Sequence, residues 1–114
     1  MGRYAAGDVV LVPLSMRGGE GRKVRPAVVL SAGEEGILVV LPISSRAPTD
    51  SPGIPLDLED FERGGLDLFE RSYVLAACGQ TVHTSEVAGK KGSLTPTAFN
   101  DISGMAMSRV RRVR

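Results

Sequence analysis

Three short apolar runs rich in β-branched residues dominate the first half of the chain, at residues 8–14, 25–31 and 36–43. Each run is bounded by Gly, Ser or Pro, a pattern typical of buried strands. Residues 32–36, between the second and third runs, are polar, contain two glycines and have the length of a hairpin connection. The second and third strands are therefore predicted to be antiparallel neighbours.

Shorter β elements are predicted in the second half of the chain. Residues 44–53 have the composition of a loop, and residues 59–65 that of a turn or short helical piece. Alternation of apolar and polar positions predicts strands at 54–58, 72–78 and 80–84, the first of them at a sheet edge.

The last element is predicted to be an amphipathic helix. Thr95 suits the N-cap and Pro96 the first helical position. Apolar residues then follow at helical spacing: Phe99, Ile102, Ala106, Val110 and Val113. Gly104 costs about 1 kcal/mol relative to Ala, so this helix depends on packing against the sheet. The fold class is mainly β (α+β), in a single domain over residues 1–114.

Composition narrows the function classes. A chain of 114 residues with 42% apolar content fits one domain. Cys78 and His83 are its only cysteine and histidine, so we expect no disulfide, no zinc site and a reducing cytoplasmic location. The N-terminus lacks a signal-peptide pattern and the longest apolar stretch is too short to span a bilayer, so no membrane association or processing is expected. A phosphate-binding Gly-rich loop, paired metal carboxylates and a nucleophile elbow are all missing from the sequence.

Charge is unevenly distributed although the net charge is only +1. Basic residues concentrate in 17–25 and 109–114, whereas seven of the 13 acidic residues lie in 50–70. Pro26 has no N–H donor and is expected at the beginning of its strand or on a sheet edge, which places Arg25 at the strand entrance. A hairpin of the second and third strands then brings Arg25 near Ser44, a guanidinium beside a hydroxyl, which together suit a phosphate.

The order and spacing of several short motifs resemble the MazF/PemK toxins. The matching segments are Gly7-Asp8-Val9-Val10, Arg25-Pro26-Ala27-Val28-Val29-Leu30-Ser31, Val40-Leu41-Pro42-Ile43-Ser44, Gly65-Leu66, Ser72-Tyr73-Val74 and Lys91-Gly92-Ser93-Leu94. The resemblance implies a small SH3-like β-barrel of the MazF/PemK/CcdB type and a homodimer. It also implies cleavage of single-stranded RNA, such as mRNA, without a metal or cofactor, and neutralisation by a cognate antitoxin. Operator DNA would be contacted only by the toxin–antitoxin complex.

The resemblance also assigns a site. The loop glutamate of the family corresponds to Glu20, the arginine of its Arg-Pro pair to Arg25, and a threonine to Ser44, which keeps the hydroxyl and loses the methyl group. Two departures favour a weakened enzyme: Gly19 stands where PemK-like members place a histidine, and Ala77-Cys78 where the family often has Asp-Gln.

The implied reaction is attack of the RNA 2′-OH on the adjacent phosphate. Glu20 is the candidate base, Arg25 the stabiliser of charge on the phosphorane and Ser44 a hydrogen-bond donor; His83 is a weaker candidate for the acid. Residues predicted to contact RNA are Arg17, Arg22, Lys23, Ser45 and Arg46. The alternative is a member that has lost catalysis, or a CcdB-like protein that binds nucleic acid or inhibits a protein target such as gyrase.

Overall fold

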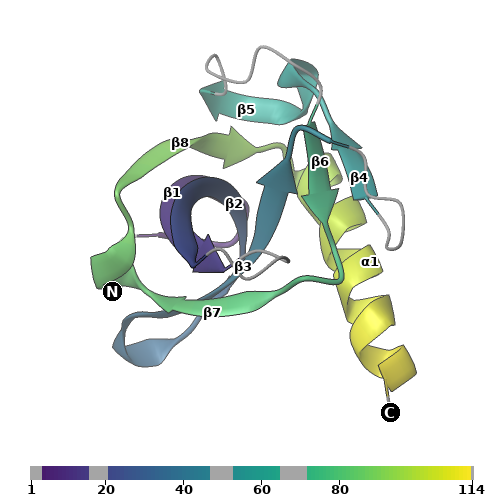
Figure 1. Ribbon diagram of the computed structural model, residues 1–114. Coiled ribbons are helices and arrows are strands. Elements are labelled where there is room, and N and C mark those ends of the chain that lie inside the picture. The colour runs from purple at the N-terminus through teal and green to yellow at the C-terminus, as the bar shows by residue number, and fades with distance from the viewer. Residues whose placement is uncertain (1–3, 16–20, 47–52, 65–71, 114) are drawn as a thin grey trace.

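The computed structural model describes residues 4–15, 21–46, 53–64 and 72–113, and from residue 107 on it describes the backbone alone. Within these ranges the chain forms strands and one long helix (Figure 1). The strands are β1 (Asp8–Ser15), β2 (Arg22–Ala32), β3 (Ile37–Ser44), β4 (Gly53–Leu56), β5 (Phe61–Gly64), β6 (Ser72–Leu75), β7 (Gln80–His83) and β8 (Gly89–Leu94). The helix α1 is Pro96–Val113, and three short 3-10 turns are η1 (Glu34–Gly36), η2 (Leu58–Asp60) and η3 (Thr84–Glu86).

One curled antiparallel sheet carries the whole fold. Its strand order is β4-β6-β3-β2-β1-β8-β5, and β7 pairs with β3 beside β6. Figure 1 shows the β1–β2 hairpin wound inside the curl, with α1 packed beside β6 and β4. This is the predicted barrel-like arrangement with a C-terminal helix, and β2 and β3 are antiparallel neighbours as the hairpin-length connection indicated.

Two apolar cores lie on opposite faces of the sheet. Alternate residues of β1 divide between them, with Val9 in the first core and Val10 and Val12 in the second. The first core also contains Ile102 and Ala106 of α1, whereas the second is built from β1, β2, β3 and β7. The second core is therefore built from strands alone.

The helix agrees with its prediction. Thr95 Oγ1 accepts a hydrogen bond from the Ala98 N–H at 3.2 Å, and Pro96 is the first helical residue. Ile102 and Ala106 are buried, while the side chains of the predicted Val110 and Val113 lie outside the described part. Among the described residues, no helix is long and apolar enough to cross a membrane.

Two strands depart from the predictions. Residues 61–64 were expected in a turn or helical piece but form β5, and β8 was not predicted as a strand. Both are rich in Gly and charged residues, and they become strands because they pair with each other and β8 also pairs with β1. Gly64 has φ +73°, and a Cβ there would lie 2.3 Å from the Lys91 carbonyl oxygen, so this pairing requires glycine.

The beginning of β2 also differs from expectation. The strand begins at Arg22, so Pro26 lies inside it and the prediction that Pro26 begins the strand was wrong. Its alternative, a sheet edge, agrees with the register: Pro26 pairs with Leu11 of β1, while pairing with β3 begins only at Ala27. The missing N–H of proline is therefore tolerated because the described part of β3 does not continue the ladder there.

Candidate functional site

Arg25 lies on β2, two residues before Ala27 of the second core. Its register partner is Val12 of β1, and residues opposite each other in an antiparallel pair share a face, so Arg25 follows Ala27 and Val29 along the core side. The side chain is half-buried, and its Nε is buried without a hydrogen-bond partner. In the ranges that the structure describes, no carboxylate pairs with this guanidinium.

A desolvated guanidinium with an unused donor is a costly arrangement for stability alone, because a buried donor without an acceptor costs about 1–3 kcal/mol. Such groups in native proteins require an explanation, and one explanation is a ligand that supplies the acceptor. Guanidinium groups match the oxygen geometry of phosphates, which they bind through two parallel hydrogen bonds. Arg25 thus has the chemistry of an anion-binding group.

Ser44 ends β3 on the same face. The β2–β3 ladder ends at Ala27 and Pro42, and continuing this register by two residues places Arg25 opposite Ser44. The backbone of Ser44 is held in strand geometry from the other side by Tyr73 of β6. Extended in this way, the register agrees with the predicted juxtaposition of guanidinium and hydroxyl, which stays a prediction because the observed ladder ends two residues earlier.

The Ser44 hydroxyl already takes part in a local turn. Its Oγ accepts a hydrogen bond from the Arg46 N–H and donates one to the Arg46 carbonyl oxygen, both at 3.1 Å. Ser45 and Arg46 are exposed. Rotation of the hydroxyl releases its proton for another acceptor while Oγ keeps the bond from the Arg46 amide. This turn therefore presents one donor and one cation next to the end of β3.

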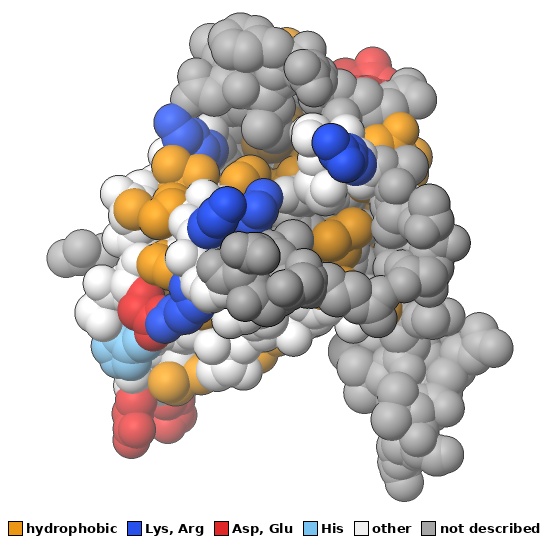
Figure 2. All heavy atoms as spheres, in the orientation of Figure 1, with side chains coloured by type: hydrophobic (Ala, Val, Ile, Leu, Met, Phe, Trp, Pro, Cys, Tyr) orange, Lys and Arg blue, Asp and Glu red, His pale blue; other side chains and the backbone are white. Residues whose placement is uncertain are grey.

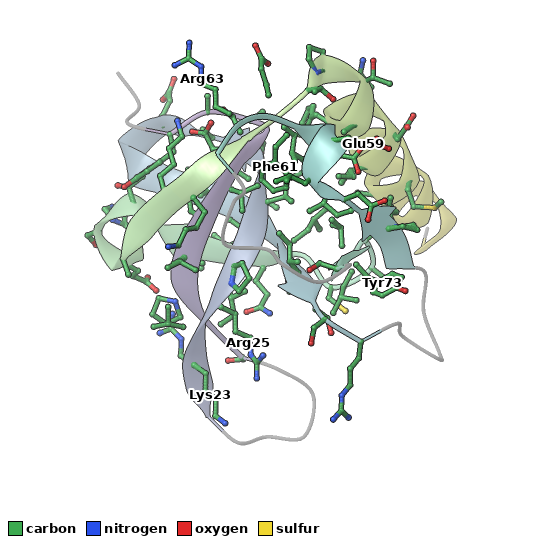
Figure 3. All side chains as sticks on the ribbon, turned by 90° about the horizontal axis from the view of Figure 1, so that it is seen from above. Lys23, Arg25, Glu59, Phe61, Arg63 and Tyr73 are labelled. Carbon is green, nitrogen blue, oxygen red and sulfur yellow. The ribbon has the colours of Figure 1, made fainter. Side chains whose placement is uncertain are left out.

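Basic side chains gather on the face that carries the hairpin. Figure 2 shows several Lys and Arg side chains there, with acidic side chains toward the edges of the view. Figure 3 places Lys23 and Arg25 together at one end of the molecule, and Glu59 and Arg63 at the opposite end. Lys23 is exposed, so β2 combines one solvated and one half-buried cation within three residues.

Arg22 is also basic but it has a protein partner. Its guanidinium pairs with a Glu86 carboxylate oxygen and donates to the Pro13 carbonyl oxygen at 3.2 Å. The hydrogen bond from Arg22 is the main cause that lowers the pKa of Glu86, and the hydrogen bond from the His83 N–H adds to it. The predicted contact of Arg22 with RNA would therefore have to replace or compete with this ion pair.

The remaining predicted residues divide into those outside the described part of the chain and His83. Arg17, Gly19 and Glu20 lie outside the described residues, so their roles stay predictions. His83 pairs with Ile37 at the first residue of β3, and Ser44 is the last, so the two ends differ by on the order of 20 Å along the strand. Its Nδ1 accepts the Ser85 N–H at 3.0 Å. His83 is thus too distant to serve as the acid beside Ser44.

Two residues near the hairpin were not predicted to have a role at the site. Gln80 forms hydrogen bonds to both backbone groups of Ser15, and Glu86 forms the pair with Arg22. No local pattern marks either residue, because the partners are 64 and 65 positions away in sequence. Ala77 and Cys78 are exposed in the turn after β6, where the Cys78 N–H bonds to the Leu75 carbonyl oxygen at 3.1 Å.

A curled antiparallel sheet that ends in one helix defines a class of small barrel-like β domains. The family model described as PemK-like, MazF-like toxin of type II toxin-antitoxin system matches residues 5–107. The chain therefore belongs to this family. No curated protein sequence matches the chain.

Solved structures confirm the fold. An endoribonuclease from a mycobacterial species is 16% identical with a TM-score of 0.72, over 97% of this chain and 94% of that one. MazF from Deinococcus radiodurans is 23% identical with a TM-score of 0.71, over 95% and 96% of the two chains. A mycobacterial endoribonuclease in complex with its cognate antitoxin is 16% identical with a TM-score of 0.67, over 97% and 96%. At these identities the likeness concerns the fold.

Proposed function

We propose that this chain is a metal-independent endoribonuclease that cleaves single-stranded RNA at selected sequences and inhibits growth as the toxin of a type II toxin–antitoxin system. The observation that carries the proposal is the half-buried Arg25, whose Nε lacks an acceptor among the described residues. Extension of the β2–β3 register by two residues supports a position of Arg25 opposite Ser44. Family membership and the relatives titled endoribonuclease support the same activity.

The proposed reaction uses the nucleophile of the RNA itself. The 2′-oxygen loses its proton to a base and bonds to the adjacent phosphorus, and the bond from phosphorus to the 5′-oxygen breaks as that oxygen gains a proton. Glu20 is the proposed base, by resemblance to the family. Arg25 stabilises the charge that develops on the phosphorane, and Ser44 donates a hydrogen bond to a phosphate oxygen. A guanidinium keeps its proton, so Arg25 is assigned no proton transfer.

RNA binding is proposed to rest on charge and hydrogen bonds. Lys23 and Arg46 are exposed cations beside Arg25 and Ser44, Ser45 adds a hydroxyl, and Arg17 joins them as a prediction. The chain has no Trp and only two Tyr, so stacking contributes little to base recognition. For a single strand, each phosphate contact makes the slope of log affinity against log salt more negative by roughly 0.7. RNA binding is therefore expected to weaken steeply as the salt concentration rises.

We further propose that the chain forms a homodimer, that it acts in the cytoplasm and that a cognate antitoxin is its partner. The relatives solved with an antitoxin support this partner. The single cysteine suits a reducing compartment.

The direct test compares wild-type protein with Arg25→Ala and Arg25→Lys on a long single-stranded RNA in EDTA. Removal of one preorganised charge-stabilising group lowers kcat by about 10²–10³-fold, and Lys restores only part because it lacks the planar fork. Arg63→Ala is the matched control, because Arg63 is exposed at the opposite end of the molecule (Figure 3). Equal cleavage by wild type and Arg25→Ala would remove the proposed site.

A second candidate is a family member that binds RNA without cutting it. Two observations favour it: the Ser44 hydroxyl is engaged with Arg46, and Ala77-Cys78 offer no carboxylate in the turn after β6. The same assay separates the candidates, since RNA binding that depends on Arg25 without any cleavage product would establish the binding protein.

A further inference from the structure

The β1–β2 hairpin extends beyond the part of the sheet that supports it. Residues 22–26 of β2 pair with residues 11–15 of β1, but the ladder to β3 begins only at Ala27. Within the described residues, no backbone ladder other than the one inside the hairpin reaches residues 22–26 of β2 or residues 12–15 of β1. Lys23 and Arg25 both lie there, so their position relative to Ser44 depends on contacts other than a backbone ladder.

One such contact holds the end of β1. The Gln80 side chain donates from Nε2 to the Ser15 carbonyl oxygen at 2.8 Å and accepts from the Ser15 N–H through Oε1 at 3.2 Å. Gln80 is the first residue of β7 and pairs with Val40 in the middle of β3. The side-chain amide of Gln80 therefore makes the two hydrogen bonds that a neighbouring strand would make with Ser15. It connects the end of β1 to β7, the strand that pairs with β3.

A second contact holds the beginning of β2. Arg22 is the register partner of Ser15, and its guanidinium pairs with Glu86 of η3, which follows β7 directly. Glu86 is itself oriented, because its other carboxylate oxygen accepts the His83 N–H at 3.3 Å. Arg22 also donates to the Pro13 carbonyl oxygen at 3.2 Å and so connects the two strands of the hairpin.

We infer that Gln80 and Glu86 are positioning residues for the cleavage reaction: together they hold the outer β1–β2 hairpin, and with it Arg25, in place against the sheet. This inference rests on the proposed function. Both residues belong to the seven-residue segment 80–86, and they hold opposite strands of the hairpin at the paired residues Ser15 and Arg22. Arg22 then acts as part of this connection and not as a phosphate contact.

The two roles of Arg22 make opposite predictions for Glu86→Gln. If Arg22 holds the hairpin, weakening its pair displaces Arg25 and lowers kcat about tenfold with little change in KM, because displacement of a catalytic group by even 1 Å is costly. If Arg22 binds phosphate, loss of Glu86 frees the guanidinium, and RNA binds more tightly with a steeper salt dependence. Tighter binding with unchanged kcat would overturn the inference.

A charge swap gives the sharper test. Arg22→Glu and Glu86→Arg each place like charges together, and each lowers kcat about tenfold or more. The double variant restores an ion pair with the wild-type net charge, and kcat returns to within about threefold of wild type if the pair positions the hairpin. A double variant as slow as Arg22→Glu alone would show that position 22 acts on RNA directly. Glu59→Arg is the control for charge reversal, because Glu59 lies at the opposite end of the molecule (Figure 3).

Hydrogen exchange separates this inference from the proposed function, because it requires no RNA. In Gln80→Ala and Glu86→Gln, amides of residues 14–15 and 22–24 exchange about tenfold faster than in wild type, while amides of β3 that pair with β2 keep their rates. Gln80→Glu keeps only the acceptor for the Ser15 N–H and falls between Gln80→Ala and wild type. Unchanged exchange in both variants refutes the inference, even if wild type cleaves no RNA.

Discussion

Replacing Arg25 with methionine should make the protein more stable while it strongly slows RNA cleavage. The guanidinium is half-buried beside the residues of an apolar core, with its Nε unpartnered within the described residues. Methionine has a similar length, fills an irregular apolar site and brings no donor that needs a partner. The expected gain in stability comes from the removal of one unsatisfied buried donor.

The size of this gain follows from the burial of Arg25. An unsatisfied buried donor costs about 1–3 kcal/mol, and the lower end applies because the side chain is only half-buried and its remaining surface is solvated. At about 2.1 cal/mol/K per residue, a chain of 114 residues has an unfolding entropy of about 0.24 kcal/mol/K. A gain of about 1 kcal/mol therefore raises Tm by about 4 °C.

Calorimetry of wild type, Arg25→Met and Arg63→Met measures this shift. Arg63 is exposed, so its variant stays within about 2 °C of wild type and controls for the loss of one positive charge. Cleavage by Arg25→Met falls about 10²–10³-fold, which is the usual trade between stability and function at an active site. A fall in Tm of 4 °C or more in Arg25→Met would mean that the guanidinium has a structural ion pair, and the proposed anion site would be refuted.

Three further predictions concern stability. Gly64→Ala should lower the free energy of unfolding by more than about 2 kcal/mol, because φ at this position is +73° and the new Cβ would clash with the Lys91 carbonyl oxygen. Urea denaturation measures this loss, and an unchanged midpoint would contradict the β5–β8 pairing. Gly104→Ala should raise the free energy of unfolding by up to about 1 kcal/mol, because a Cβ at this position of α1 meets no other atom within 4 Å. A lower free energy of unfolding would contradict this open space. The folded-state pKa of Glu86 is lowered, so its charged form adds stability above the ordinary value of 4.5, which is lost as pH falls through the lowered value. The Tm difference between wild type and Glu86→Gln should therefore shrink below pH 4.5, and a constant difference would contradict the ion pair.

The predicted elements that proved correct share strong local signals. Residues 8–14 and 25–31 lie within β1 and β2, and residues 37–43 of the third predicted run lie within β3, while Gly36 belongs to η1. Dense β-branched runs between Gly, Ser and Pro residues favour strands without help from distant segments. The beginning of α1 was predictable because Thr95 and Pro96 act within a single turn of helix. These signals operate over a few residues, so the chain itself carries them.

The elements that were missed depend on distant partners. Nothing in Gly-Lys-Lys-Gly-Ser-Leu marks β8 as a strand, and its conformation follows from pairing with β1 on one side and β5 on the other. The early beginning of β2 at Arg22 has a nearer cause, because its register partner is Ser15 in the other strand of the same hairpin. Pairing with strands elsewhere in the chain leaves no periodicity in the weaker strand.

For the site, sequence alone determined which residue types are available: a guanidinium before Pro26, a hydroxyl after a buried strand and a basic segment near both. The hairpin length even predicted that Arg25 approaches Ser44. Only the tertiary structure decided that Arg25 is half-buried without a described counter-ion, that Arg22 is held by Glu86, and that Gln80 binds Ser15. Burial and long-range side-chain pairs are properties of the curled sheet as a whole, because they depend on strands that the chain brings together from distant positions.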